Sequence, residues 1–513
     1  MLPYLTEVKY PTKKYTVSFR GINYGEGTQD GEFAETYNLS TDQYPCITQR
    51  AARVMAGKYT MPTTLHSKGN LLVIDGADVM YGGNKVGEVT LGKKQTATIG
   101  NYIVIFPDKK YYKVPTEEDQ DGTFGSMEEE YKATGLKFTT STITKEDGDE
   151  FPFREGDAVT ITGCSNSGNN KEAEIIIRGV TENELSFDDN AFTAVDAEEN
   201  EVTIKRTVPD LDFICESNYR LWGTHENTIY SSKFSDPFNF KVFDGLANDS
   251  YAIEVGSEGD FTGCIPYSSH ICFFKENTLH KLYGTKPSNF QVTTVNVYGV
   301  QSGSEGSMQI VNEQLLYKGV GGVYAYTGGV PELISEKFGN NRYSDAVACC
   351  DGEKYYISMK QGETYSMFVY DVRKNIWLRE DDTHAVDMTF YDGKVYYLDA
   401  RGGLYYIDKT ADRSDIEWGA TFCTMHETMN ERKGYSKFHL RMDMAAGAWL
   451  AVDIKTDNDL QWEQIYTTHN EKAKTISIPI IPTRCDSIDI RLRGKGKCTV
   501  KAFVREFSVG SDV

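Results

Sequence analysis

Basic side chains are scarce in this sequence relative to acidic ones. Lys and Arg number 54 against 75 Asp and Glu, which gives a formal net charge of −21. Proteins that bind nucleic acid by neutralising phosphates carry clustered Lys and Arg, so the composition argues against that class. Two interpretations remain open: the acidic surface serves solubility, or it lines a negatively charged passage through which DNA slides without sticking.

Long apolar runs are also missing. No segment reaches the roughly 18 consecutive apolar residues that a membrane-spanning helix needs. The first residues, MLPYLTEVKYPTKKYTVSF, lack the apolar core of a signal peptide. We therefore expect a soluble protein with no membrane span that is made in a cytoplasm.

Closely spaced cysteine pairs are absent. The ten cysteines are scattered along the chain and none forms a CxxC pair. Structural zinc sites usually show paired ligands at short fixed spacing, so the pattern argues against one. We expect buried free thiols in a reducing compartment.

Recognisable catalytic motifs are lacking as well. His426-Glu427 begins like the zinc-binding helix of metalloproteases, but position 430 is Asn, so the second ligand is missing. The loop SGSEGS at 302–307 has no Lys for a phosphate-binding loop. The acidic run Glu380-Asp381-Asp382 is interpreted as a solvated turn. We predict a protein that is not an enzyme and has no catalytic residues.

Metal and cofactor sites are not expected either. The acidic turns FDDN (187–190) and DGDE (147–150) carry suitable oxygen ligands for calcium, but neither has the spacing of an EF-hand loop. The eight histidines are dispersed. We predict no cofactor-binding and no metal-binding residues.

Helical patterns are short, whereas residues typical of strands and turns are plentiful. The chain has 33 Tyr, 25 Phe and 46 Gly, and Tyr and Phe favour strands while Gly favours tight turns. Residues 48–55 (TQRAARVM) are the best helical candidate. The composition predicts an all-β protein.

Short hairpins recur along the chain. Each has an apolar or aromatic run, a turn of Gly, Asp, Asn or Pro, and a second run. The candidates are 69–81, 99–112, 219–232, 268–283, 312–326, 353–371 and 390–407. A lone hairpin cannot bury its apolar face, and a series of them does so by packing sheet against sheet. This favours a β-propeller; an array of β-sandwiches is the alternative.

The predicted fold is an all-β propeller with two additions. Residues 1–114 form an N-terminal segment and the first part of the propeller, and 209–410 form its remainder. Residues 115–208, with short alternating strands between acidic stretches, predict a small β-barrel inserted into a loop. Residues 411–513, with longer alternating strands, predict a C-terminal β-sandwich.

Three stretches resemble a known family. Residues 20–53 are similar to the N-terminal segment of a tail protein of phages of Gram-positive bacteria, at Gly21, Asn23, Gly31, Glu32, Phe33, Asn38, Leu39, Ser40, Tyr44, Pro45 and Arg50. The second stretch resembles a block of phage stabilisation proteins, also called tail nozzle proteins. It comprises Arg220-Leu221-Trp222-Gly223, Ile229-Tyr230-Ser231-Ser232 and Asp236-Pro237-Phe238-Asn239-Phe240. The third, similar to blade endings of the same group, is Val369-Tyr370-Asp371 with Asn375-Ile376-Trp377.

The resemblance implies a virion protein without enzymatic activity. It implies a propeller that assembles as a homo-oligomeric ring, with six-fold symmetry favoured, at the end of the tail channel of a short-tailed bacteriophage. Its partners would be other tail or connector proteins, and genome DNA would pass through during ejection without specific binding. The protein would be made in the host bacterial cytoplasm and end in the viral tail.

Within the second stretch, each residue type has an expected role. Ser231-Ser232 would begin an exposed exit from the strand. Asp236-Pro237 would end the strand by removing a donor and fixing φ. Phe238, Phe240 and Phe243 would pack against the next blade.

Two other functions stay open. The protein could be a tail-tip protein that binds or depolymerises carbohydrate, with Trp449 and Trp462 stacking on sugars, although core packing is the simpler role for both. It could also be a monomeric host propeller that serves as an interaction platform.

Overall fold

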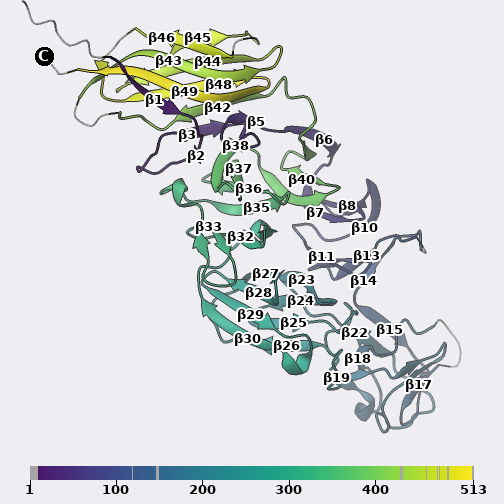
Figure 1. Cartoon of the computed structure of the whole chain (residues 1–513). Coiled ribbons are helices and arrows are strands. Elements are labelled where there is room, and N and C mark those ends of the chain that lie inside the picture. The colour runs from purple at the N-terminus through teal and green to yellow at the C-terminus, as the bar shows by residue number, and fades with distance from the viewer. Residues whose placement is uncertain are drawn as a thin grey trace, which may run out of the picture. The chain divides into compact units, whose positions relative to one another are not determined.

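The computed structural model describes residues 10–117, 119–145, 150–427, 431–457, 459–470, 472, 474–481 and 484–510. The regular structure of these residues is nearly all β (Figure 1). The helices among them are single 3₁₀ turns: η1 (Ser167–Asn169), η2 (Pro287–Asn289), η3 (Glu305–Ser307) and η4 (Glu336–Phe338). In the described part of the chain, no helix has the length and apolar character needed to cross a membrane.

The chain divides into two compact units. Unit 1 comprises Met1–Tyr59 and Gly306–Val513, and unit 2 comprises Thr60–Glu305. Each unit combines four-stranded antiparallel sheets with a pair of sheets that share a separate core.

Unit 2 contains four sheets of the recurring four-stranded kind. The first has β7 (Pro62–Lys68), β8 (Asn70–Asp75), β9 (Asp78–Tyr81) and β10 (Asn84–Glu88). The second has β11 (Gln95–Ile99), β12 (Tyr102–Phe106), β13 (Lys110–Lys113) and β14 (Thr123–Ser126). The third has β23 (Phe213–Ser217), β24 (Arg220–His225), β25 (Thr228–Ser231) and β26 (Tyr251–Glu254). The fourth has β27 (Phe261–Tyr267), β28 (His270–Lys275), β29 (Thr278–Tyr283) and β30 (Gln291–Asn296).

Two further sheets of unit 2 share one apolar core. One has the order β15 (Glu129–Ala133), β22 (Val202–Arg206), β18 (Ala158–Thr162) and β19 (Lys171–Ile176). The other has the order β16 (Lys137–Phe138), β17 (Thr142–Thr144), β21 (Glu184–Ser186) and β20 (Gly179–Val180). The strand β14 lies within the predicted insertion of 115–208, yet it pairs with β13. The segment with its own core therefore begins later, at Glu129.

Unit 1 contains three four-stranded sheets. The first has β31 (Gln309–Val311), β32 (Gln314–Gly319), β33 (Gly322–Tyr326) and β34 (Glu332–Leu333). The second has β35 (Ser344–Cys350), β36 (Lys354–Gln361), β37 (Thr364–Asp371) and β38 (Ile376–Asp381). The third joins β39 (Ala385–Tyr391), β40 (Lys394–Asp399) and β41 (Gly403–Asp408) to β6 (Ala52–Lys58), which comes from the other end of the chain.

The remaining strands of unit 1 form two larger sheets over one core. The seven-stranded sheet contains β1 (Thr12–Thr16), β4 (Leu39–Ser40), β5 (Ile47–Gln49), β43 (Lys433–Met444), β46 (Thr475–Pro479), β47 (Arg484–Cys485) and β49 (Cys498–Val509). The six-stranded sheet has the order β2 (Gly21–Ile22), β3 (Glu32–Tyr37), β42 (Glu417–Phe422), β48 (Ile488–Lys495), β44 (Trp449–Thr456) and β45 (Glu463–Thr468). The long strands expected after residue 411 are present, but the N-terminal strands β1 to β5 join them (Figure 1).

The hairpins expected from turn chemistry are present. The Asp-Gly turn joins β8 to β9, with Gly76 at a φ of +64°, which suits a residue without Cβ. The turn after Pro107 joins β12 to β13. The helix expected over 48–55 is wrong, because Thr48 pairs with Thr499 in one sheet and Ala52 pairs with Asp408 in another.

Candidate interaction surface

The hairpin between β23 and β24 presents an aromatic side chain at its tip. Asn218 and Tyr219 both have positive φ, +53° and +57°, as a two-residue hairpin turn of the primed type requires. Asn tolerates this left-handed conformation, whereas a bulky side chain such as Tyr rarely adopts it. Tyr219 is 65% exposed, and its ring lies edge-on to Phe234 with the centroids 5.7 Å apart. The turn thus holds a tyrosine toward solvent in a backbone conformation that favours smaller residues.

A long connection, residues 232–250, joins β25 to β26 and is held by Arg220. The Arg220 side chain is buried, and its guanidinium donates to the carbonyl oxygens of Ser232 (2.8 Å), Ala247 (2.9 Å) and Asp249 (2.5 Å). These acceptors lie at the two ends of the connection. One buried cation therefore closes the loop at its base.

The sequence suggested that the serine pair begins an exposed exit from the strand. This expectation is wrong, because both Ser231 and Ser232 are fully buried. Ser231 Oγ donates to the Ser232 carbonyl at 3.0 Å. Ser232 Oγ accepts from the Leu221 amide at 3.0 Å and donates to the Lys233 carbonyl at 3.1 Å. The hydroxyls satisfy backbone groups inside the fold, where an apolar side chain would leave them unpaired.

Asp236 does not end the strand as expected, because β25 already ends at Ser231; it orders the residues that follow it instead. Its carboxylate accepts from the Phe238 amide (3.0 Å) and from Asn239 Nδ2 (2.6 Å). Asn239 Nδ2 also donates to Asp157 Oδ1 at 2.8 Å, and Arg206 pairs with the other oxygen of Asp157 at 2.6 Å. Because Asp157 and Arg206 belong to the segment 129–206, this buried cluster ties that segment to the connection.

The aromatic residues of the connection split between core and surface. Phe238 and Phe240 are buried, but the core cluster that holds them contains residues of the preceding sheet β11–β14 rather than of the sheet β27–β30 that follows. Phe243 is 60% exposed, so the expectation that it packs against the next blade is wrong. We call the exposed apolar side chains of this turn and connection the aromatic loop surface; its members are Tyr219, Phe234, Phe243 and Leu246.

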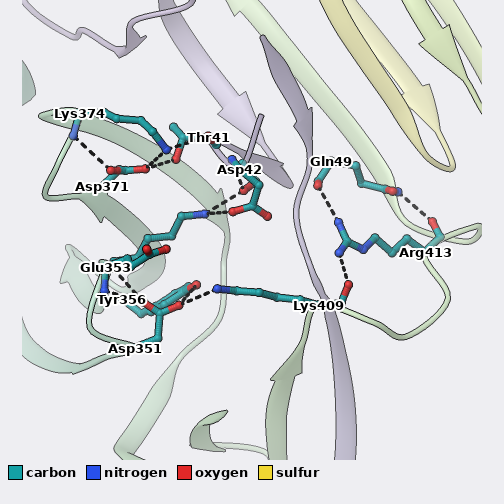
Figure 2. A network of polar contacts seen from close by, with 12 residues as sticks. Thr41, Asp42, Gln49, Asp351, Glu353, Tyr356, Asp371, Lys374, Lys409 and Arg413 are labelled. Carbon is teal, nitrogen blue, oxygen red and sulfur yellow. Dashed lines mark hydrogen bonds and ion pairs between the residues drawn. The ribbon is translucent and has the colours of Figure 1, made fainter. Parts of the chain in front are cut away.

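A second set of polar contacts holds the N-terminal segment of unit 1 (Figure 2). The buried ammonium of Lys354 donates to Ser40 Oγ at 3.0 Å and also contacts the Asp42 carboxylate. Lys374 contacts Asp371 at 2.8 Å, and Asp371 accepts from Thr41 Oγ1 at 2.5 Å. Burial would raise the pKa of Asp371, but Lys374 and Thr41 outweigh it and hold the pKa below its ordinary value.

The far side of the same network anchors the chain after β41. Lys409 contacts Asp351 Oδ2 at 3.1 Å, and Gln49 Nε2 donates to the Arg413 carbonyl at 2.9 Å (Figure 2). These contacts fix strands that are distant in sequence. They organise the fold and present no open reactive group.

The acidic run at 380–382 is not a solvated turn over its whole length. Arg53 pairs with Glu380 and Asp381, each at 2.6 Å, and both carboxylates are largely buried. Only Asp382 is well exposed. The sequence offered no sign of this pairing, because the arginine lies more than 300 residues away.

The other residues considered from sequence are scattered. Glu427 forms a buried ion pair with Arg505 at 2.7 Å, and Asn430 lies outside the described residues. Asp188 pairs with Arg178 at 3.0 Å, and residues 147–149 of the second acidic turn also lie outside the described residues. Among the residues that the structure describes, no group of three or more His, Cys, Asp and Glu is placed to hold a metal ion.

The two candidate tryptophans are not core residues. Trp449 and Trp462 are half-buried in unit 1, and arginine side chains lie over their rings, Arg493 at 6.0 Å and Arg491 at 4.4 Å from the centroids. Arg493 and Arg491 both contact Asp453. One face of each indole is therefore covered by a paired cation.

Comparison with known proteins assigns no family. No protein-family model matches the sequence, and no curated protein matches it. Similar solved structures include BamB from Moraxella catarrhalis, with 10% identity over 71% of this chain and 98% of that chain and a TM-score of 0.35. The computationally designed Ika8 protein has 10% identity over 69% and 98% with a TM-score of 0.30. Exo-beta-1,3-galactanase from Phanerochaete chrysosporium has 8% identity over 56% and 92% with a TM-score of 0.22. These scores lie below 0.5, and no conclusion about this chain rests on them.

Proposed function

We propose that this protein is a non-enzymatic structural component of a phage tail, in which identical copies assemble into a ring around the DNA channel. In this proposal seven of the nine four-stranded sheets of the described chain, all but the two of segment 129–206, are propeller blades. The segment 129–206 is a small inserted β-barrel, and the two larger sheets of unit 1 are a β-sandwich.

The observation that carries the proposal is the aromatic loop surface. Large apolar side chains stand exposed on a connection whose base is closed by the buried Arg220. Aromatic residues of this kind dominate the binding energy of protein interfaces. A connection ordered before binding loses little conformational entropy when a partner covers it, which favours tight association.

The position of this surface also supports the proposal. The residues that build its base are those of the block that resembles tail nozzle proteins, Arg220 and the Ser231-Ser232 and Asp236-Pro237 pairs among them. A ring of identical copies uses two different surfaces on each copy, so the partner of this surface would be another face of the same protein.

The excess of acidic residues fits a channel component. The formal charge of −21 per copy would be multiplied in a ring. Carboxylates repel phosphates, so a passage lined by them lets DNA move without sticking. Solubility alone would also favour an acidic surface. A DNA-binding assay tests whether this protein differs from proteins that bind nucleic acid.

The proposal is tested by the oligomeric state and the symmetry of the particles that the purified full chain forms. Mass photometry and negative-stain class averages should show closed rings, with six copies favoured. A gel-shift assay at physiological salt should show no DNA binding at sub-micromolar protein. A monomer at micromolar concentration would contradict ring assembly and favour an interaction platform, and a sub-micromolar gel shift would contradict the DNA conduit.

A further inference from the structure

Unit 1 has a polar pocket of about 570 Å³ at one end of the sheets β35–β38 and β39–β41. Its wall comes from β37 and β38, from the turns that follow β36 and β40, and from the segment that follows β2. This volume lies within the range of sites for small molecules. None of the residues that form the aromatic loop surface takes part in it.

One wall of the pocket is aromatic. The rings of Tyr365 and His384 are stacked, with an angle of 9° between their planes. Tyr24 and Tyr343 line the same space. Aromatic faces of this kind pack well against flat apolar surfaces of a ligand while leaving polar tips to select its orientation.

The hydroxyls of Tyr24 and Tyr343 are two of the polar groups on this wall. Tyr343 is 8% exposed and Tyr24 is half-buried, and in the described part of the chain no side-chain hydrogen bond links either hydroxyl to another residue. Burial raises the pKa of both phenols, so both keep their proton at neutral pH and can donate. A mostly buried hydroxyl that faces a pocket without a partner is poised to bond a ligand.

The charged groups of the pocket offset one another. Arg379 donates to Ser366 Oγ at 3.2 Å and also contacts Asp382, so its charge is already neutralised. Arg401 is exposed at the rim, where Asp399 and Glu363 also line the pocket. Two arginines against three carboxylates leave no surplus of positive charge, which disfavours a phosphate or another anion.

His384 adds no positive charge at neutral pH. Burial lowers the pKa of its ring below the ordinary value. A divalent cation is not favoured either, because the described residues hold no cluster of metal-ligating side chains. The remaining ligand class is neutral and rich in groups that both donate and accept hydrogen bonds.

We propose that this pocket binds a neutral oligosaccharide. Sugar hydroxyls donate and accept at once, which matches a site of tyrosine hydroxyls, amides, guanidinium groups and carboxylates. The apolar C–H face of a sugar ring matches the aromatic wall. Recognition of a saccharide here requires one copy of the chain and does not depend on ring assembly.

The experiment begins with a glycan array that carries neutral, sialylated and sulfated oligosaccharides, probed with the full chain. The neutral glycan with the strongest signal is then titrated by calorimetry. Tyr343→Phe removes one hydroxyl and keeps the ring, and Arg401→Ala changes an exposed residue, so both variants should fold. We expect about fivefold weaker binding for the loss of one hydrogen bond in Tyr343→Phe, and about tenfold for Arg401→Ala.

Tyr15→Phe is the matched control, because Tyr15 is 60% exposed on β1 and lies outside the pocket. It should bind the glycan as the unmodified chain does, and all three variants should keep the oligomeric state. Three results would overturn the proposal: no neutral glycan bound on the array, a preference for sulfated or sialylated glycans, or unchanged affinity in both pocket variants.

Discussion

At the scale of the residue, two buried arginines show two ways to neutralise a charge inside a β fold. Arg53 meets the carboxylates of Glu380 and Asp381, whereas the hydrogen bonds of Arg220 go to three backbone carbonyl oxygens and its guanidinium lies over the rings of Phe234 and Phe290. Carbonyl dipoles here take the place of a paired carboxylate, although Nε of Arg220 is buried without a hydrogen-bond partner. Because its acceptors belong to one connection, Arg220 holds the two ends of that connection together.

Replacing Arg220 by Met should loosen the connection of residues 232–250. Three carbonyl groups lose a charged donor, so we expect a loss of roughly 2–4 kcal/mol in the free energy of local unfolding. Limited proteolysis should cut within 232–250 in the variant first. Arg373→Ala is the control, because its ion pair with Glu353 is exposed and contributes about 0–1 kcal/mol. Equal resistance of the Arg220 variant and the control to protease would contradict the role of Arg220.

His280 should make unit 2 sensitive to acid. Its ring is buried and bonded to Ser257 Oγ (2.8 Å) and Thr294 Oγ1 (2.9 Å). Burial first, and then the charge of Lys275, lowers its pKa to about 4. The neutral ring stabilises the fold fully above the unfolded pKa of about 6.5, and this contribution is lost as the pH falls toward 4.

The expected loss is on the order of 3 kcal/mol between pH 7 and pH 4. Two experiments at pH 7 and pH 4 measure this loss in stability: thermal melting of the whole chain, and hydrogen exchange of the strands β27–β30. The variant His280→Gln should show a smaller change over the same pH range. A variant with the same pH dependence as the unmodified chain would assign the acid sensitivity to other groups.

At the scale of the element, the N-terminal strands are parts of sheets built mostly from the C-terminal end. β1 pairs with β49, β3 pairs with β42, and β6 pairs with β41. Without these N-terminal partners, the C-terminal strands β41, β42 and β49 would leave backbone groups unpaired at open sheet edges, which promote aggregation. The first and last parts of the chain therefore fold as one body.

Phe33→Ala should test this dependence. Phe33 on β3 is fully buried, and its ring centroid lies 4.9 Å from that of Phe422 on β42. Removing a buried Phe costs about 3–5 kcal/mol. Hydrogen exchange should speed up across β42–β49 although the change lies at the other end of the sequence. Tyr15→Ala, at an exposed position of β1, should leave that exchange unchanged; faster exchange confined to β3 would contradict a shared core.

At the scale of the whole molecule, the proposed ring assembly would depend on which apolar side chains stay exposed. Most large apolar side chains lie in the cores of the sheets, and those of the aromatic loop surface do not. Exposed apolar groups on a rigid loop are costly in a monomer and become favourable when another copy covers them.

The double variant Tyr219→Gly with Phe243→Ser should abolish ring formation. Gly suits the positive φ at position 219, so the hairpin should lose no stability, while two aromatic contacts per interface disappear. Hot-spot aromatics contribute about 2 kcal/mol or more each, so the loss of two weakens each interface by roughly a thousandfold. Mass photometry should find monomers that melt at the same temperature.

Val330→Ser is the matched control, because Val330 is 80% exposed in the turn between β33 and β34. It should leave the rings intact. If rings persist in the double variant, the interface between copies lies on another face of the protein and not on the aromatic loop surface.

Local chemistry made much of the fold predictable from the sequence. Asp-Gly and Pro-Asp turns with flanking apolar runs predicted hairpins such as β8–β9 and β12–β13, because turn type depends on neighbouring residues alone. Alternation over long strands likewise predicted β43, β48 and β49, since the period of two is a local property. The order of the strands in a sheet is not a local property. Residues 48–55 form strands instead of the expected helix because they pair with β49 and β41, which lie far along the chain.

The sequence by itself determined that the chain is nearly all β, where most hairpins turn, and that its surface is acidic. Only the tertiary structure decided that Ser231 and Ser232 are buried, that Glu380 meets Arg53, and that Phe243 faces solvent while Phe240 does not. The physical reason is the range of each interaction. Turns and alternation depend on a few adjacent residues, whereas burial and charge pairing depend on contacts that only the folded chain makes, such as that of Glu380 with Arg53, which lies 327 residues away.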